Sequence, residues 1–262
     1  MIMTLEQWKD NPMGRGNAMI SSTAREKIRS DYVKRFDALM VRERGRVEYN
    51  LFKDTVNNKF YAYLKIPSEV VEKFYYDVVL EFSATSDIED AGRNLMKYNV
   101  KFFANDPAFV FTYVRAYDKM GLFINELESK MARKALREAS KVKNPLGVIG
   151  YVKSLYFAYL AMYNKGLLNA TRFESEARDI DFSYLINHIE DADDKIRRRQ
   201  EEGEKVQKRK SKARKDAKKI TGNMVRDNNA AGNYIKMTSN VAKTGTINKS
   251  KRTKVSPKIK TK

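Results

Sequence analysis

Aromatic side chains are confined almost entirely to the first 194 residues of this 262-residue chain. Tyr234 is the only Phe, Tyr or Trp that follows them. Because aromatic residues supply much of the apolar area that a core buries, residues 1–194 are the part of the chain able to build one. The sequence therefore predicts one packed domain of ordinary size, followed by a segment that cannot form a core of its own.

The charge of the chain changes at the same place. Residues 195–262 contain 23 Lys and Arg against 5 Asp and Glu, a net charge of +18 out of a formal +19 for the whole sequence. The preceding residues carry 29 basic and 28 acidic side chains and are nearly neutral. A dense basic segment favours polyanions, usually nucleic acid, because each Lys or Arg near a phosphate releases a condensed counterion. The tail thus indicates a class of partner.

A first helix is indicated soon after the N-terminus. Ile28 and Tyr32 begin an apolar series at helical spacing over residues 24–42. Thr23 and Glu26 have the spacing of a capping box, in which a hydroxyl and a carboxylate bond free N–H groups of the first turn. The sequence therefore predicts an amphipathic helix that starts at this cap.

Several segments after Gly45 have the character of strands. Alternating, β-branched and aromatic residues indicate strands at 47–52, 60–66, 74–82 and, more briefly, 99–104. Two asparagines between the first two strands tolerate the backbone conformation of a tight hairpin. We expect an α+β fold with a small, mainly antiparallel sheet of three or four strands packed against several helices, a long C-terminal helix and a basic disordered tail.

The rest of the body is predicted to be helical. Asn105-Asp106-Pro107 and Asn144-Pro145 each offer a capping side chain followed by proline, which is tolerated in the first turn of a helix. The predicted helices, of which the second has one charged face, cover residues 108–119, 122–140, 146–163 and 182–219.

The third of these helices, residues 146–163, is apolar enough to be tested as a membrane span. Lys153 lies in its middle and four tyrosines are spread along it, whereas a spanning helix needs about 20 predominantly apolar residues. A helix that is apolar all round is a core helix in a soluble protein, so we expect no membrane. The aromatic residues between 102 and 163 are likewise interpreted as core packing rather than as the lining of a ligand pocket.

These patterns divide the chain into four segments. We expect an N-terminal arm at residues 1–22, the α+β body at 23–194, a basic extended helix at 195–220 and a basic low-complexity tail at 221–262. The last segment has no apolar periodicity, so burial cannot offset its ordering entropy. The absence of cysteine excludes disulfides and thiolate metal sites.

The tail carries the strongest functional signal. It has no aromatic series to stack on bases and no folded module that could read a groove, so contact with the phosphate backbone should be independent of sequence. An anionic membrane, an acidic protein surface and a merely solubilising role are the alternatives. The predicted polyanion contacts are Arg197, Arg198, Arg199, Lys208, Arg209, Lys210, Lys212, Arg214, Lys215, Lys218, Lys219, Lys251, Arg252 and Lys254.

Catalytic motifs are scarce. With one histidine, no cysteine, no glycine-rich phosphate loop and no nucleophile elbow, only carboxylate chemistry is left, and it would need a pocket near Asp77 and Glu81. These two acids, with Glu69 and Glu72, are interpreted as the polar face of a half-exposed sheet. We therefore expect a protein that is not an enzyme and has no cofactor.

His188 is the only histidine and is followed by several acids, a combination that can bind divalent metals. The glycine and the regular alternation of a calcium loop are missing, and acids on a helix would project in several directions. We expect no metal site, and we expect these acids to pair with the arginines one turn later.

Two segments resemble uncharacterised virion structural proteins of tailed bacteriophages. They read VKFFANDPAFVFTY at residues 100–113 and NPLGVIGY at residues 144–151, and the likeness covers residues 1–190 without any catalytic motif. The resemblance implies a component of the capsid interior or of the head-to-tail neck, within a symmetric multi-subunit assembly of virion proteins. It implies a location in the virion, and in the host cytoplasm during assembly, with the basic tail against DNA or an acidic neighbouring subunit.

The alternative is a cellular nucleic-acid-binding protein without sequence preference in its tail. Its body would carry a recognition surface of its own, and it would bind as a monomer or dimer. The sequence leaves both possibilities open.

Overall fold

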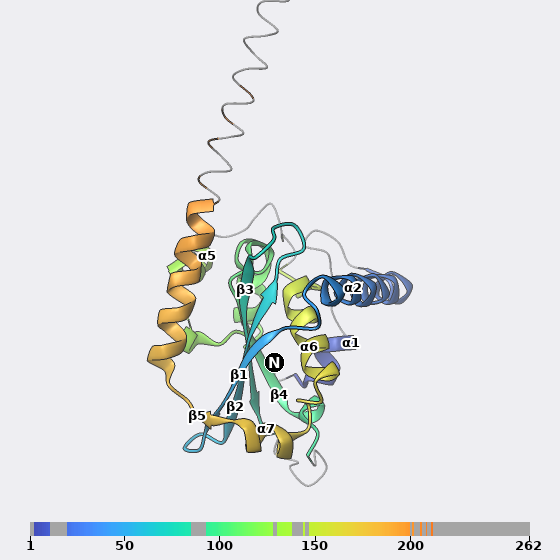
Figure 1. Ribbon diagram of the computed structural model, residues 1–262, viewed down its shortest axis with the longest axis vertical. Helices are drawn as coiled ribbons and strands as arrows, with labels where there is room; N and C mark the ends of the chain where they lie inside the picture. Colours follow the sequence, from blue (N-terminus) through green and yellow to red (C-terminus); the bar gives the residue numbers. More distant parts are fainter. Residues whose placement is uncertain are drawn as a thin grey trace, which may run out of the picture. The chain divides into compact units, whose positions relative to one another are not determined.

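The computed structural model describes residues 3–10, 20–84, 93–127, 130–137, 144 and 147–199, with the single positions 201, 205, 208 and 211. The chain divides into two units, residues 1–198 and 199–262. The sheet and the helices that cover it lie in the first unit (Figure 1).

The centre of the body is a five-stranded sheet in the order β4-β3-β2-β1-β5. The α+β class and the mainly antiparallel sheet are confirmed, because the first four strands pair antiparallel with their neighbours. The fifth, β5, pairs in parallel with β1 and was not predicted, since its two exposed residues carry no strand pattern. The strands are β1 (Glu48–Asp54), β2 (Lys59–Pro67), β3 (Tyr75–Ser83), β4 (Asn99–Ala104) and β5 (Arg178–Asp179).

The hairpin between β1 and β2 forms as the asparagines predicted. Asp54 Oδ1 accepts hydrogen bonds from the backbone N–H groups of Val56 at 3.1 Å and Asn57 at 3.0 Å. Asn58 has a φ of 50°, in the left-handed region that asparagine tolerates better than most residues. The turn and the register of the hairpin are therefore locally encoded.

The register gives the sheet one apolar and one polar face. Ala62 pairs with Leu51 and Leu80, whereas Tyr61, on the opposite face, pairs with Glu81. Glu81 in turn pairs with Lys101, because alternate residues of neighbouring strands share a face.

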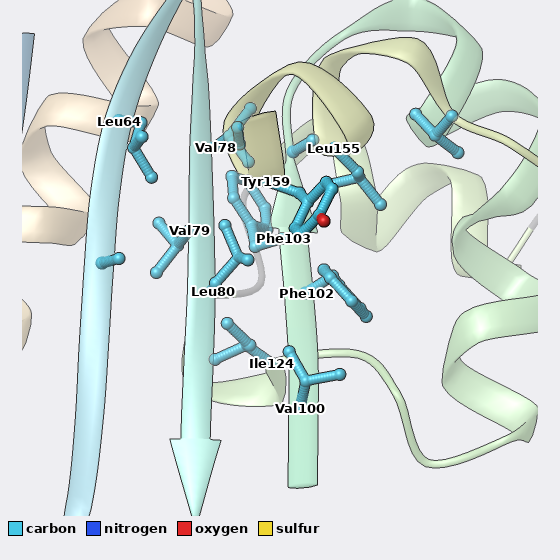
Figure 2. Packing of buried hydrophobic residues seen from close by; sticks show 14 of the residues in the cluster. Leu64, Val78, Val79, Leu80, Val100, Phe102, Phe103, Ile124, Leu155 and Tyr159 are labelled. Atoms are coloured by element: carbon cyan, nitrogen blue, oxygen red, sulfur yellow. The ribbon is translucent and has the colours of Figure 1, made fainter. Parts of the chain in front are cut away.

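Helices α1 (Leu5–Asp10), α2 (Ser22–Arg42) and α6 (Lys153–Asn164) cover the apolar face. α6 contacts β2, β3, β4 and α2, and the rings of Phe157 and Phe36 lie 5.4 Å apart between α6 and α2. Figure 2 shows Leu155 of α6 in one cluster of buried side chains with Leu80 and Phe102 of the sheet. The short helix α7 (Ala170–Glu176) extends this layer, because Phe173 packs on Phe60 at 5.5 Å.

The polar face is covered by the helix that begins at residue 182 and by the segment around α5 (Lys130–Arg137). The rings of Phe182 and Tyr61 lie 5.4 Å apart, and those of Phe123 and Phe103 lie 6.2 Å apart. In Figure 1 the helix from residue 182 (orange) and α6 lie on opposite sides of the sheet. The body is therefore a three-layer arrangement of helix, sheet and helix.

The prediction of an N-terminal arm at residues 1–22 is wrong for residues 3–10. Trp8 in α1 is fully buried, and its Nε1 donates a hydrogen bond of 2.9 Å to the hydroxyl of Tyr117. The preceding residues pair with the edge of β4, since Val100 N–H bonds the carbonyl of Met3 and Leu5 N–H bonds that of Tyr98. One large aromatic and a free sheet edge outweigh a loop-like composition. Residues 11–19 lie outside the described residues.

The helix predicted over residues 24–42 is confirmed as α2, but its cap differs. Ser21, in extended conformation, accepts a hydrogen bond from Ala24 N–H through its Oγ at 3.2 Å. Thr23 already lies within the helix, so it cannot serve as the capping residue.

The segment after β4 is helical as predicted, with a π-helical turn η2 (Phe109–Tyr113) before α4 (Val114–Lys119). Asp106 is the cap, because its Oδ1 accepts hydrogen bonds from Ala108 and Phe109 N–H at 3.0 and 3.1 Å. Ser154 in the first turn of α6 donates to the other oxygen of Asp106. This buried carboxylate therefore joins two helices.

The helix predicted over residues 122–140 is largely wrong. Leu122–Ile124 run beside β4, with Phe102 N–H bonded to the carbonyl of Leu122 at 2.8 Å. The short turn η3 (Asn125–Leu127) follows, and only α5 is helical within the described part of this range. The apolar residues at the start of the range lie beside β4 because the edge of that strand offers them backbone hydrogen bonds.

The apolar helix predicted over residues 146–163 begins later than expected, at Lys153. Asn144 does not cap a helix; its side chain bonds both the N–H and the carbonyl of Val148, at 3.2 and 2.9 Å. Gly147, with a φ of 62°, reverses the chain in this loop. In the part of the chain that the structure describes, no helix combines the length and the apolar character needed to cross a membrane.

Candidate nucleic-acid interface

The position of the basic segment is set by the edge of the sheet. β5 pairs with Phe52 and Lys53 of β1, and Ile180 N–H donates to the carbonyl of Lys53 at 3.0 Å. Asp181 then caps the next helix, since its Oδ1 accepts a hydrogen bond from Tyr184 N–H at 3.1 Å. The chain is thereby turned from the edge of the sheet onto its polar face, where residues 182–199 are helical.

This C-terminal helix packs through one narrow stripe. Leu185, Ile189, Asp193 and Ile196 are buried and follow one another at intervals of three or four residues. Such a spacing places them on one side of a helix. Among the described residues that follow Ile196, all are exposed. Within the described part of this helix, the buried stripe therefore ends where the cluster of arginines begins.

The predicted contact residues Arg197, Arg198 and Arg199 are helical and exposed, as is Lys208. Arg197 Nη2 lies 2.9 Å from Asp194 Oδ1, with 59% and 50% of the two side chains exposed. The predicted pairing of an acid with an arginine one turn later is thus confirmed for Asp194. An exposed pair of this kind contributes only about 0.2–1 kcal/mol to stability, so Arg197 loses little free energy when it exchanges Asp194 for a phosphate.

The other predicted contact residues lie outside the described residues. They are Arg209, Lys210, Lys212, Arg214, Lys215, Lys218, Lys219, Lys251, Arg252 and Lys254. The predicted disorder of residues 221–262 lies outside them as well.

A second basic surface belongs to α5. Its exposed side chains are Lys130, Arg133, Lys134 and Arg137, while Ala132 and Ala135 are buried and turn toward the body. The sequence predicts one charged face in this region but does not by itself assign these residues to an interface. The available signal was four basic residues at helical spacing in an eight-residue helix without an acid.

α5 lies beside the C-terminal helix. Lys130 Nζ is 3.7 Å from Glu190 Oε2, and a groove with a volume of about 330 Å³ runs between the two elements. The groove contains equal numbers of basic and acidic side chains and has no net charge. Its lining consists of Lys130, Met131, Lys134, Glu190, Asp193, Asp194 and Arg197.

The expectation that Asp77 lies on a half-exposed face is wrong, because only 3% of Asp77 is exposed under the C-terminal helix. Its two oxygens accept hydrogen bonds from the Tyr63 hydroxyl at 2.7 Å and from Asn105 Nδ2 at 3.1 Å. Burial raises the pKa of Asp77 to about 6, although these hydrogen bonds and Lys65 oppose the shift. The buried Asp193 adds to the rise in pKa.

Glu81 is also buried, with 1% exposed, and the same correction applies to it. Its Oε1 lies 3.2 Å from Lys59 Nζ and 3.7 Å from Lys101 Nζ, so two strands neighbouring β3 supply its counter-charges. Burial and the Glu81 carboxylate together raise the pKa of Tyr61. Both buried carboxylates of β3 thus interact with side chains from neighbouring strands or the residues that follow them.

His188 packs against aromatic rings rather than beside a group of acids. Its ring lies 4.2 Å from that of Tyr184 and 6.5 Å from that of Tyr63. The neighbouring acids diverge, with Glu190 near Lys130 and Asp194 near Arg197. Among the described residues, no three His, Asp or Glu side chains are grouped so that they could hold a metal ion.

Comparison of the chain with protein-family models, with curated proteins and with solved structures gives no match.

Proposed function

We propose that this chain is a non-enzymatic structural protein of a phage particle, located in the capsid interior or the head-to-tail neck. Its body contacts neighbouring protein subunits, and its basic C-terminal extension contacts DNA or an acidic neighbouring subunit. The observation that carries the proposal is the end of the packed stripe at Ile196, followed at once by Arg197, Arg198 and Arg199. Residues 199–262 contain 20 basic and 5 acidic side chains.

The test is a deletion of residues 200–262, which leaves Ile196 and the packed stripe in place. Binding of both proteins to a DNA duplex of arbitrary sequence is measured from 50 to 200 mM salt. If the extension engages about six phosphates, the affinity of the full-length chain falls about a thousandfold over this range. The deletion should make the salt dependence of binding much shallower and leave the thermal melt unchanged.

A control of equal length separates charge from chain. In it the basic residues of 200–262 are replaced by glutamine, and it should behave like the deletion. Equal binding by the full-length and deleted proteins would contradict the DNA contact. If neither binds DNA, the search moves to an acidic protein surface as the partner of the extension.

The alternative function is a cellular nucleic-acid-binding protein without sequence preference. The observation that favours it is the basic exposed face of α5, which gives the body a surface of its own. Light scattering during size-exclusion chromatography distinguishes the two functions. Rings or larger assemblies support the virion component, whereas a monomer or dimer that prefers one nucleic-acid structure supports the alternative.

A further inference from the structure

We infer that the exposed face of α5 is a phosphate-binding surface of the body that contacts the backbone of duplex DNA. The inference rests on the proposed function, because it assigns part of the DNA contact to the folded body in addition to the extension. It concerns residues 1–198 alone.

The exposed face of α5 is made of basic side chains. Lys130, Arg133, Lys134 and Arg137 are all exposed and stand at positions i, i+3, i+4 and i+7 of one helix. With a rise of about 1.5 Å per residue, they form a row about 10 Å long on one side of α5. Every exposed position of α5 is basic, so the helix presents a single sign of charge to solvent.

The basic side chains of this row repel one another. Lys130 and Lys134, and likewise Arg133 and Arg137, are like-charged pairs at i,i+4, an arrangement that destabilises a helix. α5 itself contains no acid that could relieve the repulsion. Glu190, 3.7 Å from Lys130, offsets part of this repulsion. A polyanion bound along the row would offset more of it, so binding and helix stability reinforce each other.

The acids on the side of the C-terminal helix that faces α5 lie at the groove between the two helices. Glu190 lies near Lys130, Asp194 pairs with Arg197, and Asp193 is buried, so these acids are drawn into the groove between the helices. Arg133 and Arg137 are not part of the groove lining. Among the described residues of this region, the net positive charge therefore lies on the outer side of α5.

The dimensions and chemistry of the row fit a phosphate backbone. Phosphates of one strand follow one another every 3.4 Å along the duplex axis, so a row of about 10 Å faces about three of them. The face carries no aromatic side chain for stacking on bases, which favours backbone contact without sequence preference. A membrane fits less well, because Ala132 and Ala135 are buried and α5 has no apolar face left to insert into lipid.

The test is made in the full-length chain. Lys130, Arg133, Lys134 and Arg137 are replaced together by glutamine, which has a helix propensity close to theirs. The charge-matched control replaces Lys27, Lys34, Arg44 and Arg46, four exposed basic residues outside α5, by glutamine. A second variant, R133K with R137K, keeps the charge of the row and should bind DNA as the parent does.

Binding to a DNA duplex is measured as a function of salt for all four proteins. Loss of about three phosphate contacts makes the log–log salt slope shallower by about 2.7, so the loss of affinity between 50 and 200 mM salt shrinks about fortyfold. The control variant should keep the parental slope. Thermal melts of each protein establish that the variants are folded. If the fourfold glutamine variant is not, the double variant R133Q with R137Q carries the test, with a proportionally smaller change of slope.

Equal slopes for the α5 variant and the parent would overturn the inference and leave the proposed function intact, provided that deletion of residues 200–262 still abolishes binding. Equal losses in the α5 variant and the control would also overturn it, since only overall charge would then matter. If the α5 variant loses binding to phosphatidylglycerol vesicles but keeps its binding to DNA, the surface belongs to a membrane instead. If R133K with R137K binds as weakly as the glutamine variant, the effect is not one of charge and the inference fails.

Discussion

The two faces of the sheet are covered by helices in different ways. On the apolar face, α6 and α2 bury a continuous layer of side chains, with Phe157 against Phe36 and Leu155 against the strands (Figure 2). On the polar face, the helix from residue 182 covers Asp77 and Glu81, each of which needs hydrogen-bonding or charged partners. Apolar burial is non-directional, whereas each buried polar group has to be matched individually.

This difference indicates which helix is held more firmly. The apolar face gains stability in proportion to the area it buries, whereas the polar face loses part of its gain to the desolvation of carboxylates. The C-terminal helix, which leads into the basic extension, therefore lies on the less favourable face.

The largest effect is expected from Phe157→Ala in α6. Phe157 is almost fully buried and packs its ring against both Phe36 and Tyr32. Removal of a buried phenylalanine leaves a cavity and lowers the free energy of unfolding by about 3–5 kcal/mol. Urea denaturation measures this loss, and a change below about 1 kcal/mol would break the proposed contrast between the two faces.

The next largest effect is a dependence on pH caused by Asp77. Its pKa is raised from 3.8 to about 6 in the folded chain, so between these values the folded state binds more protons than the unfolded state. The free energy of unfolding should therefore rise, by about 2.4 kcal/mol from this group, as the pH falls from 7 to 4.

Asp77→Asn isolates this contribution from those of other titrating groups. When the pH is lowered from 7 to 4, the free energy of unfolding should change less favourably in this variant than in the parent, by the amount that Asp77 contributes. An identical pH profile in both proteins would show that Asp77 is not desolvated by the covering helix.

A smaller effect is expected from Ile189→Ala in the C-terminal helix. Ile189 is buried in the packed stripe and belongs to the apolar core cluster, but the helix that carries it covers the face of the sheet that contains the buried Asp77. We expect a loss of about 2 kcal/mol, at the lower end of the range for this substitution. Hydrogen exchange should locate the loss in residues 182–199, and a uniform change over the whole body would argue against a helix that is held separately.

The smallest effect is expected from Asp194→Asn. This change removes the exposed partner of Arg197, at a distance of 2.9 Å, and should alter stability by less than about 1 kcal/mol. It frees Arg197 for a phosphate and removes one negative charge, so affinity for duplex DNA at low salt should rise. A fall in affinity would mean that Asp194 orients Arg197 for its partner.

Local patterns were sufficient for much of the fold. The four main strands, the hairpin at Asp54 and Asn58, and α2 follow from periodicity and turn chemistry, which act over a few residues. The division between a neutral body and a basic extension is likewise a property of composition. Apolar residues are few after Ile196, and the described residues that follow it are exposed.

Other features depended on partners distant in sequence. β5 has no strand pattern in its sequence and forms because the edge of β1 is open to pairing. Leu122–Ile124 have a helical pattern but pair with the edge of β4 instead. The basic row of α5 was visible as spacing, but its place beside the C-terminal helix required the fold.

The sequence by itself determined the α+β class, the main strands and the separation of charge, because periodicity and composition are local or additive. Only the tertiary structure decided that Trp8 belongs to the core and that Asp77 and Glu81 are buried. The physical reason is that burial depends on what covers a residue. The cover for the polar face comes from a helix that starts about 100 residues later in the chain.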